Sequence, residues 1–558
     1  MTSPSSAANT QFYGPLPVEA RSPDAQDLIP NSASRSMAHV ICTPDAELGE
    51  PALTQGLSEK TLSGRDLSAT QEVFFLDLFW DSWHCCYQLL DEVEFKAHYA
   101  SLWNQAIGDT RKDSPLVDIV LALCMQFGVT SIPRQSGRKA EVNNRDAPVA
   151  GRWLYQRCQR LISGDLERPT LETFQCQLWS AIYLGNASYQ NMAQSMLGVA
   201  TRTAYTLGLH IEIQGSDLPF KEREARKRAW CILVMAETRS CIRLGRPWVT
   251  QTQQIAPFLP TGGPMIPSGG VAHLSYTKER AKLTEIARTA FDVAVNGRSK
   301  AVANMANSRS QVANYATGME RIRDWAEALP KTLKTDRRGD GKPLSTDLSE
   351  IEIEVFAPIW LRRQRLMLEL FYHELMLTLG RNCISQSLTH AGGTFSPSPE
   401  TSNVIEVSVL HAAATTQLLY QVYQEYDILN GWYEPLNCQW NAAITLVGYL
   451  LTTKTDSTVG SIAQSALSQS ITVLERMGEF FGTAASAASV IRTLQQKLNT
   501  RVQVQATNEN NVTAGGLGDI NFSGWENDDM SFEGILGTFG TESELDILGL
   551  GIDLEPFA

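Results

Sequence analysis

Three potential metal ligands are adjacent at one point of this 558-residue chain, in the sequence His84-Cys85-Cys86. Imidazole nitrogens and thiolates are preferred zinc ligands, and a structural zinc site uses four of them in a tetrahedron. The apolar sequence around them predicts a helix, in which consecutive side chains point about 100° apart. These side chains therefore cannot hold one zinc ion without distant partners, and packing in a hydrophobic core is the favoured interpretation.

Acidic residues gather at Asp91-Glu92-Val93-Glu94, the nearest approach in this chain to the carboxylate cluster of a magnesium-dependent helical enzyme. Asp91 followed by Glu94 is also the pattern of a helix N-cap with a capping box, and this simpler interpretation is favoured. The sequence has no Gly-x-Ser-x-Gly elbow, no Gly-rich loop ending in Gly-Lys-Ser/Thr and no His-Glu-x-x-His. We therefore expect no enzyme, no catalytic residue, no metal and no other cofactor.

Basic side chains form two short groups, Arg226-Lys227-Arg228 and the stretch from Lys331 to Lys342. Either group could contribute to a nuclear import signal. Glutamates stand four residues before Arg226 and Arg228, so paired charges on a solvated helix face are the favoured interpretation of the first group. The second group lies in a polar stretch that we predict to be a flexible linker, and it is the better import candidate.

One long helix must position the first basic group, because the stretch from Lys221 to Thr250 has a charged start, an apolar middle and an abrupt end. Gly245 and Pro247 end it, since glycine tolerates the left-handed conformation at a helix C-terminus and proline cannot continue a helix. Arg243 and Arg246 bracket this end and could bind a small anionic effector. Hydrogen bonds to the last carbonyl groups of the helix are the favoured alternative.

The same helix carries a tryptophan, an acidic residue seven positions on, and a Gly-Arg-Pro sequence that starts fifteen positions after the tryptophan. This spacing resembles the signature of the fungal-specific transcription factor regulatory domain, the middle homology region usually found downstream of a binuclear zinc-cluster DNA-binding domain. The resemblance covers roughly residues 71–255 and implies a helical regulatory domain. Glu237-Thr238 stands where the family more often has Asp-Arg. The residues that carry the signature are Trp230, Glu237, Gly245, Arg246 and Pro247.

The length allows one large or two ordinary domains with a substantial core. The net charge of -13 argues against nucleic-acid binding by the chain as a whole, because phosphate neutralisation needs clustered Lys and Arg. The N-terminus lacks the pattern of a secretory signal, and we find no apolar run long enough to span a membrane. The ten cysteines are scattered, as expected for reduced thiols in an intracellular protein. We expect a nuclear protein that does not contact membranes.

The composition divides the chain into four parts. Residues 1–68 are rich in Ser, Pro, Ala and Thr and are predicted to be a disordered arm. Helical patterns follow in residues 71–255, predicted to form a first lobe of the regulatory domain, and in residues 276–500, predicted to form a second lobe. Residues 502–558 are predicted to be a disordered tail.

Local signals place the helices within the two lobes. An apolar stripe with three-and-four spacing from Val73 to Tyr87 opens the first lobe, and Asp91, Ser114 and Thr170 are predicted N-caps. No alternation with period two is long enough to predict a strand. The predicted fold is therefore all-α, a large domain of antiparallel helices with disordered N- and C-terminal segments. Helices of the second lobe are expected at 276–329, 356–382, 403–428, 436–453, 457–482 and 484–499.

The tail contains no Lys or Arg, and its acidic residues alternate with bulky apolar ones. This composition is typical of amphipathic activation segments. Repulsion between the carboxylates keeps the apolar side chains from collapsing together, so that they can enter a groove on a co-activator as a short helix. A tail that only solvates the protein is the alternative. The apolar residues expected to make the contact include Trp525, Phe532, Leu545, Leu548 and Phe557.

The zinc-cluster half that usually accompanies the family's domain has no counterpart in these residues. No Cys-x2-Cys-x6-Cys array occurs, and Cys42 is the single thiol of the arm. Either the protein works without this half, or a partner supplies it, or an upstream exon is missing from the sequence.

The function that these patterns indicate is a nuclear transcriptional regulator. The resemblance implies control of a fungal metabolic or biosynthetic gene set, such as a secondary-metabolite cluster. Co-activators would bind the tail, and a zinc-cluster partner would contact DNA. One alternative is a co-repressor or effector-binding scaffold that heterodimerises with a full-length zinc-cluster factor. An all-α enzyme is a further, less favoured alternative.

Overall fold

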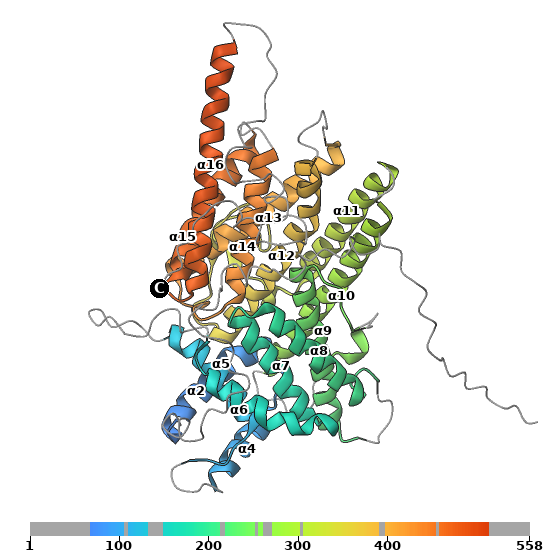
Figure 1. The fold of residues 1–558 in the computed structure, drawn as a ribbon, viewed down its shortest axis with the longest axis vertical. Helices are drawn as coiled ribbons and strands as arrows, with labels where there is room; N and C mark the ends of the chain where they lie inside the picture. The colour runs from blue at the N-terminus through green and yellow to red at the C-terminus, as the bar shows by residue number, and fades with distance from the viewer. Residues whose placement is uncertain are drawn as a thin grey trace, which may run out of the picture.

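The fold is known from a computed structural model, which describes residues 67–104, 110–131, 149–212, 218–250, 255–260, 270–301, 305–389, 397–452 and 457–512. Helices dominate these residues, as the sequence predicts, and the two-stranded sheet is small (Figure 1). The predicted arm, apart from its last two residues, lies outside the described part. No helix in the described ranges has the length and apolar character needed to cross a membrane.

Helices α2 to α8 gather at one end of the molecule, and α9 runs between them and the rest (Figure 1). The short antiparallel connection between α7 and α8 lets these two helices pack closely. The bounds are α2 Ala69–Asp81, α3 Trp83–Cys86, α4 Glu92–Asn104, α5 Pro115–Ser131, α6 Arg152–Ile162, η4 Ser163–Glu167, α7 Leu171–Asn186, α8 Gln190–Thr206 and α9 Phe220–Leu244.

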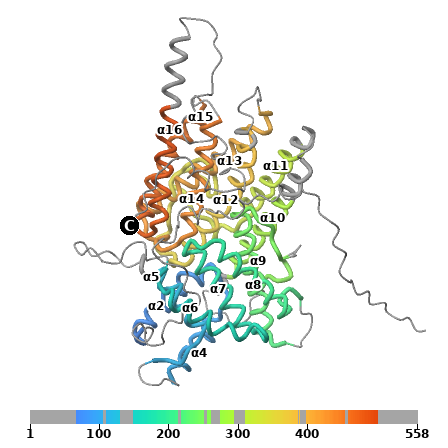
Figure 2. Tube along the Cα trace, in the orientation of Figure 1, coloured from blue at the N-terminus to red at the C-terminus, as the bar shows by residue number. Residues whose placement is uncertain are grey.

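Helices α10 to α16 form the other end, where α12, α13, α14 and α15 pack side by side (Figures 1 and 2). The predicted helical stretch 276–329 is two antiparallel helices, α10 and α11. The bounds are η5 Ala256–Phe258, α10 Gly270–Ala301, α11 Met305–Ala328, η6 Lys331–Leu333, β1 Asp336–Arg337, β2 Ile351–Glu352, α12 Ile359–Thr389, α13 Pro399–Glu425, α14 Glu434–Thr452, α15 Thr458–Gly478 and α16 Gly482–Val512.

Side-chain caps begin several of these helices where the sequence predicts them. The Asp91 carboxylate accepts from the Glu94 N–H at 3.0 Å, and α4 starts at the next residue after Asp91. The Thr170 hydroxyl accepts from the Thr173 N–H at the start of α7, which completes a capping box with the Thr173 side chain. Such caps satisfy backbone donors that have no partner within the helix.

The apolar stripe from Val73 to Tyr87 does not form one continuous helix. The backbone at Ser82 leaves the helical region, with φ -100° and ψ -100°, and separates α2 from the short helix α3. One member of the stripe, Val73, is 46% exposed. The break turns α3 inward, and this short helix packs against α10 and α12 from the other end of the molecule.

The predicted linker around residues 331–342 is an ordered part of the fold, so that prediction is wrong. Strands β1 and β2 pair antiparallel, with Asp336 opposite Glu352 and Arg337 opposite Ile351. The strands are two residues long, too short to show an alternating pattern in the sequence. Their stability comes from contacts with α12 and α13, described below.

Helix α16 extends to Val512 and therefore continues into the segment assigned from sequence to the tail. Residues 513–558, including all five apolar residues expected to contact a co-activator, lie outside the described part.

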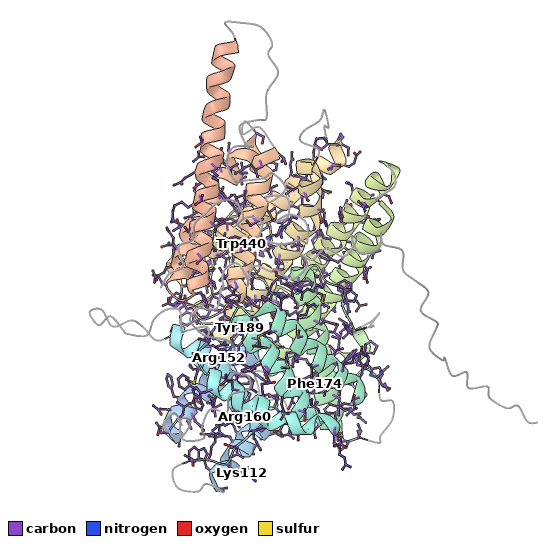
Figure 3. The ribbon with its side chains drawn as sticks, in the orientation of Figure 1. Lys112, Arg152, Arg160, Phe174, Tyr189 and Trp440 are labelled. Carbon is purple, nitrogen blue, oxygen red and sulfur yellow. The ribbon has the colours of Figure 1, made fainter. Side chains whose placement is uncertain are left out.

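One connected cluster of buried side chains extends from Leu76 to Leu494. Phe174 belongs to it in the group of helices at one end, and Trp440 belongs to it at the other end (Figure 3). Helix α9 passes through this core, so its buried polar side chains face both groups of helices.

Candidate functional site

Trp230 anchors the middle of α9 in the core. The indole is 1% exposed, and its ring centroid lies 5.6 Å from that of Tyr205 and 6.0 Å from that of Phe258. Aromatic pairs at this spacing add to the stability that burial alone gives. The signature tryptophan thus joins α9 to the end of α8 and to η5.

Glu237 fixes the chain that follows α9. Its carboxylate is buried, and it accepts hydrogen bonds from the Val249 N–H at 2.6 Å, from the Thr250 N–H at 3.2 Å and from the Thr250 hydroxyl. Arg288 of α10 approaches the same carboxylate to 4.0 Å and donates to the Thr250 carbonyl at 2.6 Å. The signature acid therefore holds the end of α9, the following turn and α10 together.

Gly245 ends α9 in the left-handed conformation, with φ 62°. The N–H groups of Gly245 and Arg246 both donate to the Cys241 carbonyl, which satisfies an acceptor of the last helical turn. The Arg246 side chain donates instead to Asn191 at 2.6 Å and to Gln194, both on α8. The turn therefore directs this side chain toward α8.

Pro247 and Arg243 complete the end of α9. The Pro247 carbonyl accepts from the Cys241 thiol at 3.5 Å, so the turn is tied back to the helix through a side chain as well. Arg243 points toward Glu374 of α12, with 4.0 Å between Nη2 and Oε1.

Arg239 forms the centre of a buried ionic cluster, which we define as Arg239, Glu374, Glu434, Arg280 and Tyr87. Arg239 Nη1 lies 2.7 Å from Glu434 of α14, and Nη2 lies 3.0 Å from Glu374 of α12. Burial opposes the charge on Arg239, but the two carboxylates outweigh this effect and raise its pKa. Arg239 is therefore charged and cross-links three helices.

Tyr87, which follows α3, and Arg280 of α10 extend the ionic cluster. The Tyr87 hydroxyl donates to Glu434 at 2.6 Å, and the Arg280 guanidinium lies over the Tyr87 ring at 5.0 Å. Burial favours the neutral acid at Glu434, but Arg239 and Arg280 hold its pKa below the usual range. Cation–π contact and paired charges are how proteins accommodate buried guanidinium groups.

Known fungal transcription factors match most of the chain. The sequence profile described as the fungal specific transcription factor domain matches residues 76–267. Over 493 residues the chain is 32% identical to transcription factor asqA of Emericella nidulans, an alignment that covers 85% of this chain and 86% of that protein. The chain belongs to the fungal-specific transcription factor family.

Two further relatives are similar over a comparable length. The terreic acid cluster-specific transcription factor atF of Aspergillus terreus is 32% identical over 510 residues, covering 82% of this chain and 75% of the relative. The oosporein cluster regulator OpS3 of Beauveria bassiana is 23% identical over 480 residues, covering 77% of this chain and 62% of the relative. This member of the family is thus a fungal transcriptional regulator and not an enzyme.

The possible metal ligands of this family member lie around the break between α2 and α3. Cys85 and Cys86 are buried, with their sulfur atoms 3.7 Å apart, and the Cys85 thiol donates to the Ser82 carbonyl at 2.8 Å. His84 turns its Nε2 to the Leu90 carbonyl at 3.0 Å, so Nε2–H is the donor. Within the described ranges, no three His, Cys, Asp or Glu side chains are arranged to hold a metal ion.

The two basic groups proposed as import signals are engaged in the fold of this regulator. Arg226 donates to the Leu207 carbonyl, and burial lowers the pKa of Arg228. In the second group Arg337 is buried and paired with Glu369, whereas Arg338 is half exposed and pairs with Glu350 and Glu425. These contacts hold arginines of both groups within the ordered fold.

Sequence reasoning missed Arg239 and all of its partners. A signal existed, because Arg239 is an arginine within the apolar middle of a helix, where an unpaired charge would cost several kcal/mol. Its acidic partners come from α12 and α14, far along the chain, and only the fold identifies them. The cluster joins its charges in pairs across α9, α12 and α14, so its role is cross-linking of helices.

Proposed function

We propose that this protein is a nuclear activator of a fungal biosynthetic gene cluster that makes a secondary metabolite. The observation that supports the proposal is the identity of 32% to a terreic acid cluster-specific transcription factor, over an alignment that covers 75% of that relative. A second relative, at 23% identity, is named a regulator of the oosporein cluster. Two similar proteins that each control one cluster support the same task for this chain.

In this proposal the acidic tail recruits the transcription machinery. Carboxylates along residues 513–558 repel one another, and the apolar side chains between them would enter a co-activator groove. The helical domain ends at α16, which reaches Val512, and the acidic segment follows it in the sequence. A zinc-cluster transcription factor that pairs with this chain would contact DNA.

Deletion and overexpression of the gene in the fungus that carries it test the proposal. RNA sequencing should show that one set of adjacent biosynthetic genes falls together on deletion and rises together on overexpression. A rise of those genes on deletion would instead support the co-repressor scaffold. Absence of any coordinated set in both strains would refute the proposal.

The role of the tail needs a separate measurement. Residues 502–558 fused to a heterologous DNA-binding domain should activate a reporter gene. Replacement of Trp525, Phe532, Leu545 and Leu548 by Ala should abolish the activation, because the apolar side chains make the contact. A matched control replaces four Ser, Thr or Asn residues of the same segment by Ala and should stay active. Equal activity of the two variants would contradict the mechanism.

A further inference from the structure

Two buried histidines face each other between α12 and α13. His373 Nδ1 lies 2.7 Å from His411 Nδ1, and the side chains are 0% and 4% exposed. At this distance one Nδ1 carries a proton and donates it, while the other accepts. The hydrogen bond therefore requires that at least one of the two rings is neutral.

Charged groups reach the histidine pair from three neighbouring elements. Glu369, one turn earlier on α12, has a carboxylate oxygen 3.7 Å from His373 Nε2, and it pairs with Arg337 of β1. Arg323 of α11 acts electrostatically on His411. Glu327 of α11 and Glu369 act in the same way on the neighbouring Tyr372.

The remaining neighbours of the pair add one more ion pair and an uncharged network. Glu374 follows His373 directly and is bound to Arg239. Toward α14 and α15, helix α13 presents Thr416, which accepts from the Gln439 side chain at 3.1 Å. The carboxylate of Glu369 is thus the acidic group that lies against the pair, and it is already shared with Arg337.

The hairpin of β1 and β2 is held by the same two helices. Arg337 binds Glu369 on α12, as described above. Gln421 on α13 binds Ile351 of β2 twice, accepting from the backbone N–H at 2.7 Å and donating to the carbonyl at 3.0 Å. The hairpin is therefore clamped across the seam between α12 and α13, and it depends on the spacing of these helices.

Helices α12 and α13 are packed so closely that the seam cannot absorb a displacement of the two histidines. Helices α12 and α13 meet closely at Gly380, where an added Cβ would lie 2.9 Å from the Val404 carbonyl oxygen. The Ser408 hydroxyl also donates across the seam to the Met376 carbonyl at 3.3 Å. Interiors packed this tightly respond to a disruption by switching between arrangements and not by gradual deformation.

We propose that the His373–His411 pair is a proton-operated latch that holds the β1–β2 hairpin closed across the seam between α12 and α13. One proton added to the pair is tolerated, because His373 can then donate to His411 through Nδ1 and face Glu369 through Nε2. A second proton occupies the remaining Nδ1 lone pair. The Nδ1–H···Nδ1 hydrogen bond is then lost and two cations face each other, so the helices part.

Parting of the helices releases the hairpin. The released segment contains basic residues of the group from Lys331 to Lys342 and two strongly exposed apolar residues. Val355 and Phe356 are 72% and 97% exposed, and they lie shortly after the end of β2 at Glu352. The latched state holds this segment rigid through Arg337 and Gln421. The open state frees it as a flexible peptide that another protein can bind.

The direction of the pH effect follows from burial. Burial, His373 and Arg323 lower the pKa of His411 well below its ordinary value. In the open state His411 regains an ordinary pKa of about 6.5, so the open state binds the extra proton. The latch is fully closed above about pH 6.5, and the opening constant rises about tenfold for each pH unit below that value.

Hydrogen–deuterium exchange of the full-length chain at pH 7.5 and pH 5.5, corrected for intrinsic rates, measures the latch. Amide protection in residues 336–353 should fall about tenfold at pH 5.5, while α5 and α7 keep theirs. The His411→Gln variant retains an acceptor but cannot take up the proton, so it should lose the pH dependence. A His98→Gln control should behave like the natural chain, because His98 lies on α4, bonded to Ser114.

Arg337→Gln tests the same inference from the hairpin side if His411→Gln does not fold. This variant removes the ion pair to Glu369 and should leave the hairpin poorly protected at both pH values. Three results would each overturn the latch: unchanged hairpin protection in the natural chain, the same tenfold fall in His411→Gln, or a simultaneous loss of protection in α5 and α7.

Discussion

Arg239 of α9 and Glu434 of α14 meet at 2.7 Å in the middle of the molecule, and both side chains are almost fully buried. With Glu374 as a second acceptor, this contact ties the signature helix of the family to two helices of the other end. The contact therefore cross-links the two groups of helices.

Replacement of Arg239 by Met should lower the free energy of unfolding by about 3–5 kcal/mol, because two carboxylates would stay buried without their cation. Urea unfolding followed by Trp fluorescence measures the change. The matched control is Lys221→Met, which removes an exposed pair with Glu94 at 2.7 Å. Exposed pairs contribute about 0–1 kcal/mol, so equal losses in the two variants would contradict the role of the cluster.

Two glycines should respond in opposite directions to replacement by Ala. Gly245 has φ 62°, and a side chain there is strained, so Gly245→Ala should cost about 1–2 kcal/mol. Gly198 lies within α8 with open space around its missing Cβ, so Gly198→Ala should stabilise the protein by about 0.5–1 kcal/mol. Thermal unfolding of both variants checks the signs. If both variants were destabilised, the loss in Gly245→Ala could not be assigned to the left-handed conformation of the turn after α9.

Local signals explain which parts of the fold were predictable. The caps at Asp91 and Thr170 and the stop at Gly245 act within a few residues, and each is present in the structure. The hairpin was missed because its two-residue strands are stabilised by Glu369 and Gln421, side chains of helices that follow it. Tertiary contacts decide such elements, and sequence periodicity does not contain them.

The candidate functional site also contains residues that local sequence signals identify and residues that only tertiary contacts identify. Trp230 and Glu237 were identified by their spacing in one helix. The partners that give them a role, such as Phe258 and Arg288, lie on later elements. One charge pair expected within α9 is replaced by a longer-range contact, because Arg226 donates to the Leu207 carbonyl at the end of α8, whereas Glu224 still acts electrostatically on Arg228. Pairing over short sequence distance is weak and yields when the fold offers buried acceptors.

Glu237→Gln should destabilise the protein by about 2–3 kcal/mol, because hydrogen bonds to a buried charge are stronger than those to a neutral amide. The Val249 N–H would lose an ionised acceptor, and Arg288 would lose its countercharge. Urea unfolding of Glu237→Gln, Arg288→Met and the double variant measures the coupling. The two single effects should fall short of additivity by at least about 0.5 kcal/mol. If the effects of the two single variants were additive, Arg288 would not interact with Glu237.

Acid should lower the free energy of unfolding through protonation of His84, in addition to opening the His373–His411 latch. Burial lowers the pKa of His84 to about 4, although a hydrogen bond with the Leu90 carbonyl opposes this shift. In the unfolded chain the pKa is about 6.5, so the unfolded state binds more protons below that pH. His84 therefore costs nothing above pH 6.5, and its destabilising effect grows as the pH falls toward 4. The ring is only partly covered, so we expect a loss of about 1–2 kcal/mol.

Unfolding midpoints in urea at pH 7, 6, 5 and 4.5 separate the contribution of His84 from that of other groups. His84→Gln keeps a donor for the Leu90 carbonyl but does not titrate, so its midpoint should fall less steeply between pH 6.5 and 4.5. The matched control is His98→Gln, which replaces a histidine on α4 that is bonded to Ser114 and not to Leu90. Identical slopes for the natural chain and His84→Gln would show that His84 is protonated as easily in the folded protein as in the unfolded one.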